Sequence, residues 1–277
     1  MAPGGSAADA GVAPASGFNY ELVRRNAQLA ASGVKLPRTL KTGTTICGVV
    51  YRDGVVLGAD TRSTNGDTVA DKNCEKIHYI ADNIYCCGAG TAADTEATTN
   101  MVASALAMHR FSTNRQSRVI TALTMLKSHL FRYQGHVSAA LVLGGFDING
   151  PHLFTVYPHG SSDSLPYATM GSGSLAAMSI FEAGFKENMT KEEAMKLVAD
   201  AIKSGVFNDL GSGSNVDLCI ITKDGREYLR NYECPNPRPY ASNSFHFAKG
   251  TTPVLRTAEI TLKDVIVEDG AEAMEVA

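Results

Sequence analysis

The fold of this chain is decided by the stretch Thr44-Thr45-Ile46-Cys47-Gly48-Val49-Val50-Tyr51-Arg52-Asp53-Gly54-Val55-Val56-Leu57-Gly58-Ala59-Asp60. Two apolar runs rich in β-branched residues flank an Asp-Gly dipeptide, a pattern typical of a tight β-hairpin. The hairpin returns Asp60 to the neighbourhood of Thr44, within a diagonal pair of roughly 7–8 Å. A change of register by one residue would turn Asp60 to the opposite face.

Strand and helix patterns alternate regularly after this hairpin. A second hairpin is expected from strands 74–80 and 84–87, after a short strand near 68–70. Helical spacing begins at Thr91, where Thr91 and Asp94 have the spacing of a capping box. The remaining expected elements are helices 119–133, 175–185 and 191–203, the last ended by Gly205, and strands 139–145, 152–157, 167–170, 217–222 and 227–231.

This order of elements defines a fold class and three segments. Strands, two helices, strands, two helices and strands predict an α+β protein, a four-layer α-β-β-α sandwich of two mostly antiparallel sheets. Residues 1–43 form an appended segment, because an Ala/Gly/Pro/Ser opening precedes a polar, basic stretch with little strand pattern. Residues 233–277 are rich in proline and poor in apolar residues, which predicts an arm that lies on something else.

Composition excludes several classes of protein. The 277 residues are 44% hydrophobic and 19% charged, enough for a large core, and the formal net charge is −3. That charge disfavours nucleic-acid binding and a basic membrane-surface module. The apolar runs are shorter than the ~18 residues of a membrane span, and no secretion signal is recognised. Six cysteines without a C-x-x-C pair predict a reducing compartment, cytoplasm or nucleus, with no metal and no cofactor.

One motif suggests a different function. Gly88-Ala89-Gly90-Thr91-Ala92-Ala93 has the G-x-G-x-x-A pattern of a dinucleotide-binding oxidoreductase. However, no acidic residue follows about 20 residues later, and the preceding strands form hairpins. A tight turn that leads into a helix explains the motif better, and it leaves backbone N–H groups where an oxyanion could bind.

Several motifs together resemble one enzyme family. The motifs Gly43-Thr44-Thr45-Ile46, Gly58-Ala59-Asp60-Thr61-Arg62 and Asp71-Lys72-Asn73-Cys74-Glu75-Lys76-Ile77 precede the glycine-rich turn, and two Gly-Ser-Gly-Ser turns follow it. Across residues 41 to 232 this order resembles the catalytic β-type subunits of the 20S proteasome, which are N-terminal nucleophile hydrolases. The chain is most similar to the subunits of trypsin-like specificity. Cys47 departs from the small alanine common in the family, a change that concerns strand packing only.

The resemblance implies a function and a setting. It implies a threonine endopeptidase that cleaves unfolded, ubiquitin-targeted polypeptides after basic residues, without a cofactor. The expected partners are other α- and β-type subunits in stacked seven-membered rings, and regulatory caps. The sequence leaves open a non-catalytic ring subunit of the same fold, which would lack the catalytic threonine, aspartate or lysine. All three positions are filled here, by Thr44, Asp60 and Lys76.

Thr44 needs a base before its hydroxyl can act as a nucleophile. An α-amino group, with an unperturbed pKa of about 7.7–8.0, is such a base. It exists on Thr44 only after the Gly43–Thr44 bond is cut. Residues 1–43 are therefore predicted to be a propeptide, removed on maturation, in front of a catalytic domain of residues 44–232.

The resemblance assigns further roles around Thr44. Lys76, expected in the middle of strand 74–80, needs a carboxylate partner among its apolar neighbours, and Asp60 is the natural one. In the family the lysine lowers the pKa of the threonine and the aspartate holds the lysine. The N–H of Gly90 matches the oxyanion donor. The groups that match those around the amine and its water are Ser172, Asp209 and Ser212.

The resemblance also implies a substrate site. Backbone groups of Thr64, Gly90 and Ala92 would pair with the substrate as an added β-strand. Gly88 would give the side-chain pocket depth and Glu96 would give it negative charge, although an acid in the first turn of a helix also suits the helix dipole. The residues expected to frame this pocket are Ser63, Cys74, His78, Gly88, Ala92 and Glu96.

Overall fold

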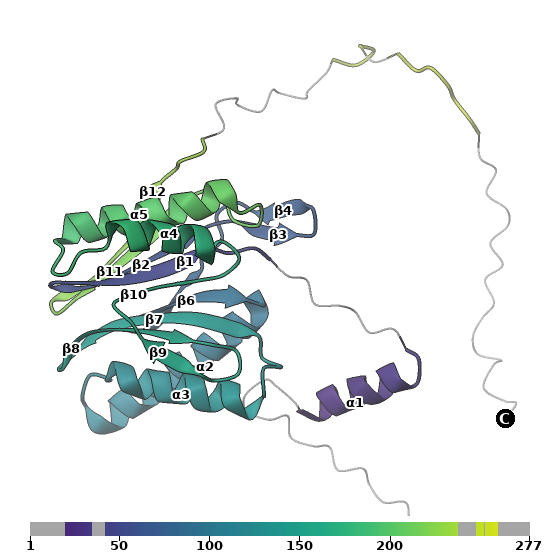
Figure 1. Cartoon of the computed structure of the whole chain (residues 1–277). Coiled ribbons are helices and arrows are strands. Elements are labelled where there is room, and N and C mark those ends of the chain that lie inside the picture. Colours follow the sequence, from purple (N-terminus) through teal and green to yellow (C-terminus); the bar gives the residue numbers. More distant parts are fainter. Residues whose placement is uncertain (1–19, 35–41, 238–247, 252, 260–277) are drawn as a thin grey trace, which may run out of the picture. The chain divides into compact units, whose positions relative to one another are not determined.

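The computed structural model (Figure 1) describes residues 20–34, 42–237, 248–251 and 253–259. The chain divides into two units, Met1–Pro237 and Arg238–Ala277. Most of the predicted arm lies outside the described residues, and its described residues from 248 onward contain no helix or strand. Within the N-terminal segment, Tyr20–Ala31 form helix α1, which the sequence analysis did not predict.

Two five-stranded antiparallel sheets form the middle of the first unit. The first has the order β10-β1-β2-β11-β12, and the second has the order β5-β6-β7-β8-β9. The first sheet contains β1 (Ile46–Tyr51), β2 (Gly54–Asp60), β10 (Tyr167–Met170), β11 (Val216–Thr222) and β12 (Gly225–Glu233). The second contains β5 (Ile77–Ala81), β6 (Ile84–Gly90), β7 (Ala139–Asp147), β8 (Gly150–Val156) and β9 (Ser162–Ser164).

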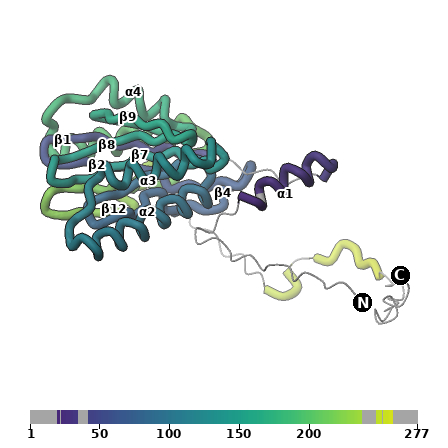
Figure 2. Tube along the Cα trace, turned by 90° about the horizontal axis from the view of Figure 1, so that it is seen from below, coloured from purple at the N-terminus to yellow at the C-terminus, as the bar shows by residue number. Residues whose placement is uncertain are grey.

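Helices cover the outer face of each sheet. Helices α4 (Ser174–Gly184) and α5 (Lys191–Asn208) pack on the first sheet. Helices α2 (Ala92–Thr113) and α3 (Val119–Arg132) pack on the second, and Figure 2 shows them side by side. The predicted four-layer α-β-β-α sandwich is thus confirmed (Figure 1).

Apolar side chains fill each of the spaces between neighbouring layers in the described part of the chain. Leu57 and Val142 belong to the cluster between the two sheets. Phe181 and Ile202 belong to the cluster between the first sheet and its helices, and the second sheet and its helices share another cluster that includes Leu126. Burial of these faces supplies the main drive for stacking the layers.

The predicted first hairpin forms with the register that the site needs. Ile46 pairs with Ala59 and Tyr51 with Gly54, so Arg52 and Asp53 form the turn. One residue beyond the ladder, the Asp60 N–H donates to the Thr45 carbonyl at 3.1 Å. Asp60 therefore lies across from the residue that follows Thr44.

The second hairpin differs from the expectation at its start. Strand β5 begins at Ile77, so Lys76 precedes the strand and does not lie in its middle. Residues 74–76 make isolated bonds instead: the Cys74 N–H donates to the Thr61 carbonyl, and the Gly88 N–H donates to the Lys76 carbonyl, both at 3.0 Å. The expected strand near 68–70 is β4 (Thr68–Asp71), which pairs with β3 (Ser63–Asn65). Strands β3 and β9 were missed because three-residue strands carry almost no periodic signal.

Two expected helix signals were wrong. Helix α5 continues through Gly205 to Asn208, and a Cβ at Gly205 would lie 2.2 Å from Thr45 Oγ1. This glycine therefore allows a close approach of α5 to the start of β1 and does not stop the helix. At the start of α2, Thr91 makes no side-chain capping bond, and the Asp94 carboxylate accepts the Ser138 N–H at 3.0 Å.

The described residues also bear on membrane and metal binding. Among them, no helix has the length and apolar character that crossing a membrane requires. In the same part of the chain, no cluster of three or more His, Cys, Asp or Glu side chains could hold a metal ion. All six cysteines are free thiols, four of them buried in the core.

Candidate active site

Three residues meet at the entrance to β1. The Lys76 Nζ donates to the Thr44 Oγ1 at 3.2 Å and forms an ion pair with the Asp60 Oδ1 at 2.8 Å. Thr44 is 4% exposed, Lys76 7% and Asp60 0%. The three residues predicted to carry the chemistry therefore form one buried group, joined by a hydrogen bond and an ion pair.

Asp60 is held rigidly from both of its oxygens. Its Oδ1 also accepts the Thr45 N–H at 2.9 Å, and its Oδ2 accepts the N–H groups of Gly213 at 3.1 Å and Arg62 at 3.2 Å. Three backbone donors and a buried ammonium thus surround one carboxylate, the environment in which a buried charge is stabilised.

A second polar group approaches the Thr44 nitrogen. The Thr44 N–H donates to the Ser172 Oγ at 3.0 Å, and the hydroxyls of Ser172 and Ser212 each donate to the Asp209 Oδ2 at 2.6 Å. Burial raises the pKa of Asp209, but these hydrogen bonds and the Gly211 N–H outweigh it and hold that pKa below its ordinary value. The structure therefore places an ionised carboxylate one hydroxyl away from the nitrogen of Thr44.

The peptide bond in front of Thr44 is also part of this group. The Gly43 carbonyl oxygen accepts the Thr44 hydroxyl at 2.7 Å and the Lys76 ammonium at 3.2 Å. Gly43 packs directly on another backbone segment, because a Cβ built on it would lie 2.1 Å from the Gly211 Cα. Only glycine fits at position 43 without displacing the turn that carries Ser212.

Gly90 lies at the end of β6, where it can present its N–H to the same site. The Gly88 N–H points to the Lys76 carbonyl, and N–H groups two residues apart on a strand point to the same side. We therefore expect the Gly90 N–H to face the side of β6 on which the Lys76 carbonyl lies. Its φ of +108° is one that side-chain-bearing residues rarely adopt.

A cavity of about 100 Å³ adjoins Thr44. Its lining includes every residue predicted to frame the side-chain pocket: Ser63, Cys74, His78, Gly88, Ala92 and Glu96. Thr64, a predicted backbone partner of the substrate, lies in β3 and is not part of this lining. Burial lowers the pKa of His78, while Glu96 and Glu75 oppose that shift, so the imidazole adds little positive charge to this cavity at neutral pH.

Two expectations about the pocket need revision. A Cβ on Gly88 would lie 2.0 Å from the Thr95 Cγ2, so the glycine is what allows α2 to pack closely on β6. Glu96 lies beyond the first turn of α2, in which Asp94 is the acidic residue. The helix dipole weakens after the first turn, so it explains Glu96 less well than expected.

Other residues of the site were not predicted from the sequence. Glu75 and Thr95 line the cavity, and the Arg62 guanidinium donates to the Leu210 carbonyl at 3.1 Å. The Thr45 hydroxyl lies 2.7 Å from the Ser212 hydroxyl. The quoted motifs contain Arg62, Thr45 and Glu75 and could have drawn attention to them, whereas no local signal marks Thr95.

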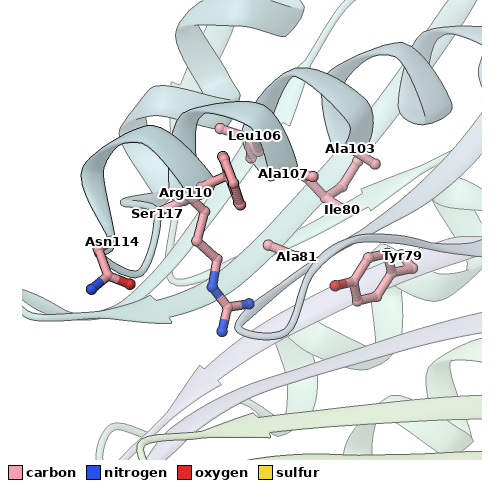
Figure 3. A pocket seen from close by; sticks show the side chains of 10 residues that line it. Tyr79, Ile80, Ala81, Ala103, Leu106, Ala107, Arg110, Asn114 and Ser117 are labelled. Carbon is pink, nitrogen blue, oxygen red and sulfur yellow. The ribbon is translucent and has the colours of Figure 1, made fainter.

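A larger cavity, about 400 Å³, lies between α2 and β5 (Figure 3). Its lining includes Tyr79, Leu106 and Arg110, and Arg110 pairs with Asp82 in the turn after β5. None of the groups around Thr44 reaches it, so this cavity is not the candidate active site.

The four-layer α-β-β-α sandwich, with a threonine hydrogen-bonded to a lysine at the start of an inner strand, defines the class of N-terminal nucleophile hydrolases. A family model described as "Proteasome subunit" matches residues 40–221. The chain is 64% identical over 265 residues to proteasome subunit beta type-7-A of Arabidopsis thaliana, covering 95% of this chain and 97% of that protein. It is 64% identical to beta type-7 of Dictyostelium discoideum (91% and 96% covered) and 51% identical to beta type-10 of Mus musculus (96% and 98% covered).

The chain therefore belongs to the proteasome subunit family. It is a catalytic β-type subunit of the 20S core, a threonine endopeptidase with trypsin-like activity, and it assembles with other proteasome subunits.

Proposed function

We propose that this endopeptidase activity uses the Thr44 hydroxyl as nucleophile and the α-amine of the same residue as base. The observation that carries the proposal is the convergence on Thr44. The Lys76 ammonium lies 3.2 Å from its hydroxyl oxygen and the Ser172 hydroxyl 3.0 Å from its nitrogen. Removal of residues 1–43 converts that nitrogen from an amide, which is not a base, into an amine.

Each group then has a defined role in the reaction. The amine of Thr44 takes the hydroxyl proton as the oxygen attacks the substrate carbonyl carbon, and the Lys76 ammonium stabilises the developing charge on that oxygen. The Gly90 N–H donates to the oxyanion of the tetrahedral intermediate. The protonated amine gives its proton to the leaving amine as the tetrahedral intermediate collapses to an ester on Thr44. The amine, now neutral, takes a proton from the water that hydrolyses this ester and returns it to the Thr44 oxygen as that oxygen leaves.

Asp209 and the two serines keep the amine in place. The Ser172 hydroxyl joins the Thr44 nitrogen to the Asp209 carboxylate, and Ser212 donates to the same oxygen. An ionised carboxylate at this distance favours the protonated amine that forms during attack. These residues therefore orient the base and balance its charge.

The first prediction concerns the N-terminus of the working subunit. In purified, assembled and active particles the intact mass of this chain should correspond to a start at Thr44, with residues 1–43 absent. The physical reason is that a nitrogen in a peptide bond cannot accept the hydroxyl proton. Active particles in which this chain begins at any other residue would contradict the mechanism.

The second prediction concerns Glu96, which supplies charge to the cavity next to Thr44. Glu96→Gln should lower kcat/KM for peptides that end in arginine by about 10-fold, with much less effect on leucine peptides. Removing one member of a fully buried charge pair would lower kcat/KM further, but Glu96 is exposed to water, which reduces the effect. Hydrolysis is measured on assembled particles, after subtraction of the rate that Thr44→Ala particles show.

Glu192→Gln is the matched control, because it removes an acid from the first turn of α5, far along the sequence from the cavity. It should leave both rates unchanged. An Arg-over-Leu preference that survives Glu96→Gln would assign the basic specificity to another acid.

The proposal extends to the assembly, cellular location and substrates of this subunit. The chain occupies one place in stacked seven-membered rings of α- and β-type subunits, bound by regulatory caps, in cytoplasm and nucleus. Its substrates are unfolded, ubiquitin-targeted polypeptides that pair with backbone groups near Thr44. Residues 233–277 extend over a neighbouring subunit, a placement supported by their high proline content and few apolar residues.

A further inference from the structure

Arg230 of β12 gathers an unusual number of contacts from one short segment. Its Nη2 donates to the Asn73 carbonyl at 2.6 Å and to the Asn73 Oδ1 at 2.9 Å. Its Nη1 donates to the Cys74 carbonyl at 3.4 Å, and its Nε lies 3.5 Å from the Glu75 Oε1. One guanidinium thus contacts three consecutive residues that lie more than 150 positions away in the sequence.

Asp217 also holds the Arg230 guanidinium. The Arg230 Nη1 also donates to the Asp217 Oδ2, and Asp217 is fully buried in β11. The Asp217 Oδ1 accepts the Asn231 N–H at 2.8 Å. Asp217 lies where the register between β11 and β12 shifts, an irregularity of the kind that redirects a side chain. Asp217 therefore anchors the Arg230 guanidinium to the first sheet, and from there the guanidinium contacts residues 73–75.

The segment that it holds has little other support. Residues 73–75 belong to no strand. The Cys74 N–H donates to the Thr61 carbonyl at 3.0 Å, and the Asn73 N–H donates to the nearby Asp71 carboxylate at 2.8 Å. Yet Cys74 and Glu75 line the cavity next to Thr44, so this segment is one wall of the pocket that receives the substrate side chain.

Lys76 follows directly but is held independently. Its ammonium pairs with Asp60, and its carbonyl accepts the Gly88 N–H of β6. Loss of the Arg230 contacts would therefore loosen the pocket wall at Cys74 and Glu75, whereas Lys76 would keep its own contacts and its position beside Thr44. This separation allows an effect on substrate selection to be distinguished from an effect on chemistry.

We infer that Arg230 is a positioning residue for specificity, which ties the wall formed by Cys74 and Glu75 to the first sheet. The inference rests on the proposed assignment of Thr44 and of the adjoining pocket. A guanidinium suits this position because its planar fork can bond a carboxylate and backbone carbonyls at fixed angles.

The test compares kinetic constants of assembled particles that carry Arg230→Met with those of the unaltered chain. KM for arginine-ending peptides should rise about 5–10-fold, and the Arg-over-Leu ratio of kcat/KM should fall by a similar factor, with kcat within about twofold. Background hydrolysis by Thr44→Ala particles is subtracted. A residue needed only for folding would lower the number of active sites and hence the apparent kcat for both peptides, with KM unchanged.

Two further variants keep this test decisive. Arg230→Met leaves the buried Asp217 without its cation, so Arg230→Met/Asp217→Asn removes the unpaired charge and keeps an acceptor for Asn231. This double variant should show the same rise in KM. Arg226→Met is the control, because Arg226 lies on the same strand over the rings of Tyr79 and Tyr85; it should change neither KM nor the ratio.

The outcomes separate this inference from the function on which it rests. A peptide vinyl sulfone ending in arginine is used to label the particles, and the labelled residue of this chain is found by mass spectrometry. Labelling of Thr44 together with an unchanged KM and Arg-over-Leu ratio in both Arg230 variants would overturn the role of Arg230. A label on any residue other than Thr44 would instead overturn the proposed function.

Discussion

Replacing Thr44 with alanine should reduce the hydrolysis of arginine-ending peptides by this subunit by about 10⁵-fold or more, below the background of the particle. The variant lacks the oxygen that attacks, and no other described hydroxyl takes its place beside Lys76. It should also keep residues 1–43, because the Thr44 hydroxyl is bonded to the carbonyl of the bond to be cut. Peptide hydrolysis and the intact mass of the chain measure the two effects.

Thr44→Ser is the matched control for this variant. It retains a hydroxyl at the same position and should keep measurable hydrolysis and a processed N-terminus. Arginine-specific hydrolysis by Thr44→Ala particles at more than a small fraction of the normal rate would show that the nucleophile lies elsewhere.

Lys76→Met should lower kcat on the order of 10³-fold, the size expected when one preorganised electrostatic partner of a reacting oxygen is lost. It should also destabilise the chain, because it leaves the fully buried Asp60 carboxylate without its cation. The loss of stability is about 3–5 kcal/mol for a buried pair of this kind, reduced by the three backbone donors that Asp60 retains. Thermal unfolding and active-site-normalised kcat report the two effects.

The double variant Lys76→Met/Asp60→Asn separates stability from catalysis. It removes both charges, so it should recover much of the lost stability while kcat stays low. If kcat recovered together with stability, Lys76 would matter only for the fold, and Thr44 would need another activating group.

The features that sequence could predict are local ones. The Asp-Gly turn and the β-branched runs beside it specify the first hairpin, and that hairpin places Asp60 next to the residue after Thr44. The order of strand and helix patterns was enough for the four layers. The serines of the Gly-Ser-Gly-Ser turns were selected through their resemblance to a family, because a turn of this composition has no chemical meaning by itself.

The features that sequence could not predict depend on contacts between distant segments. Gly205 resembles a helix stop, and its actual neighbour, Thr45, lies 160 positions earlier in the chain. Lys76 has the sequence surroundings of a strand residue, but the Cys74 N–H bonds to the distant Thr61 carbonyl and β5 begins only at Ile77. Arg230 belongs to no recognised motif, and it contacts Asn73 only because the folded chain brings these distant segments together.

The fit of Gly43 against Gly211 has a consequence for inheritance. Residue 43 belongs to the part of the chain predicted to be discarded, so its close fit serves each molecule once, before the first substrate arrives. A gene that encodes a bulkier residue there would yield fewer finished molecules, but each finished one would be chemically identical to the normal product. Such an allele would act as a change of dose, invisible to any assay of the purified enzyme per active site.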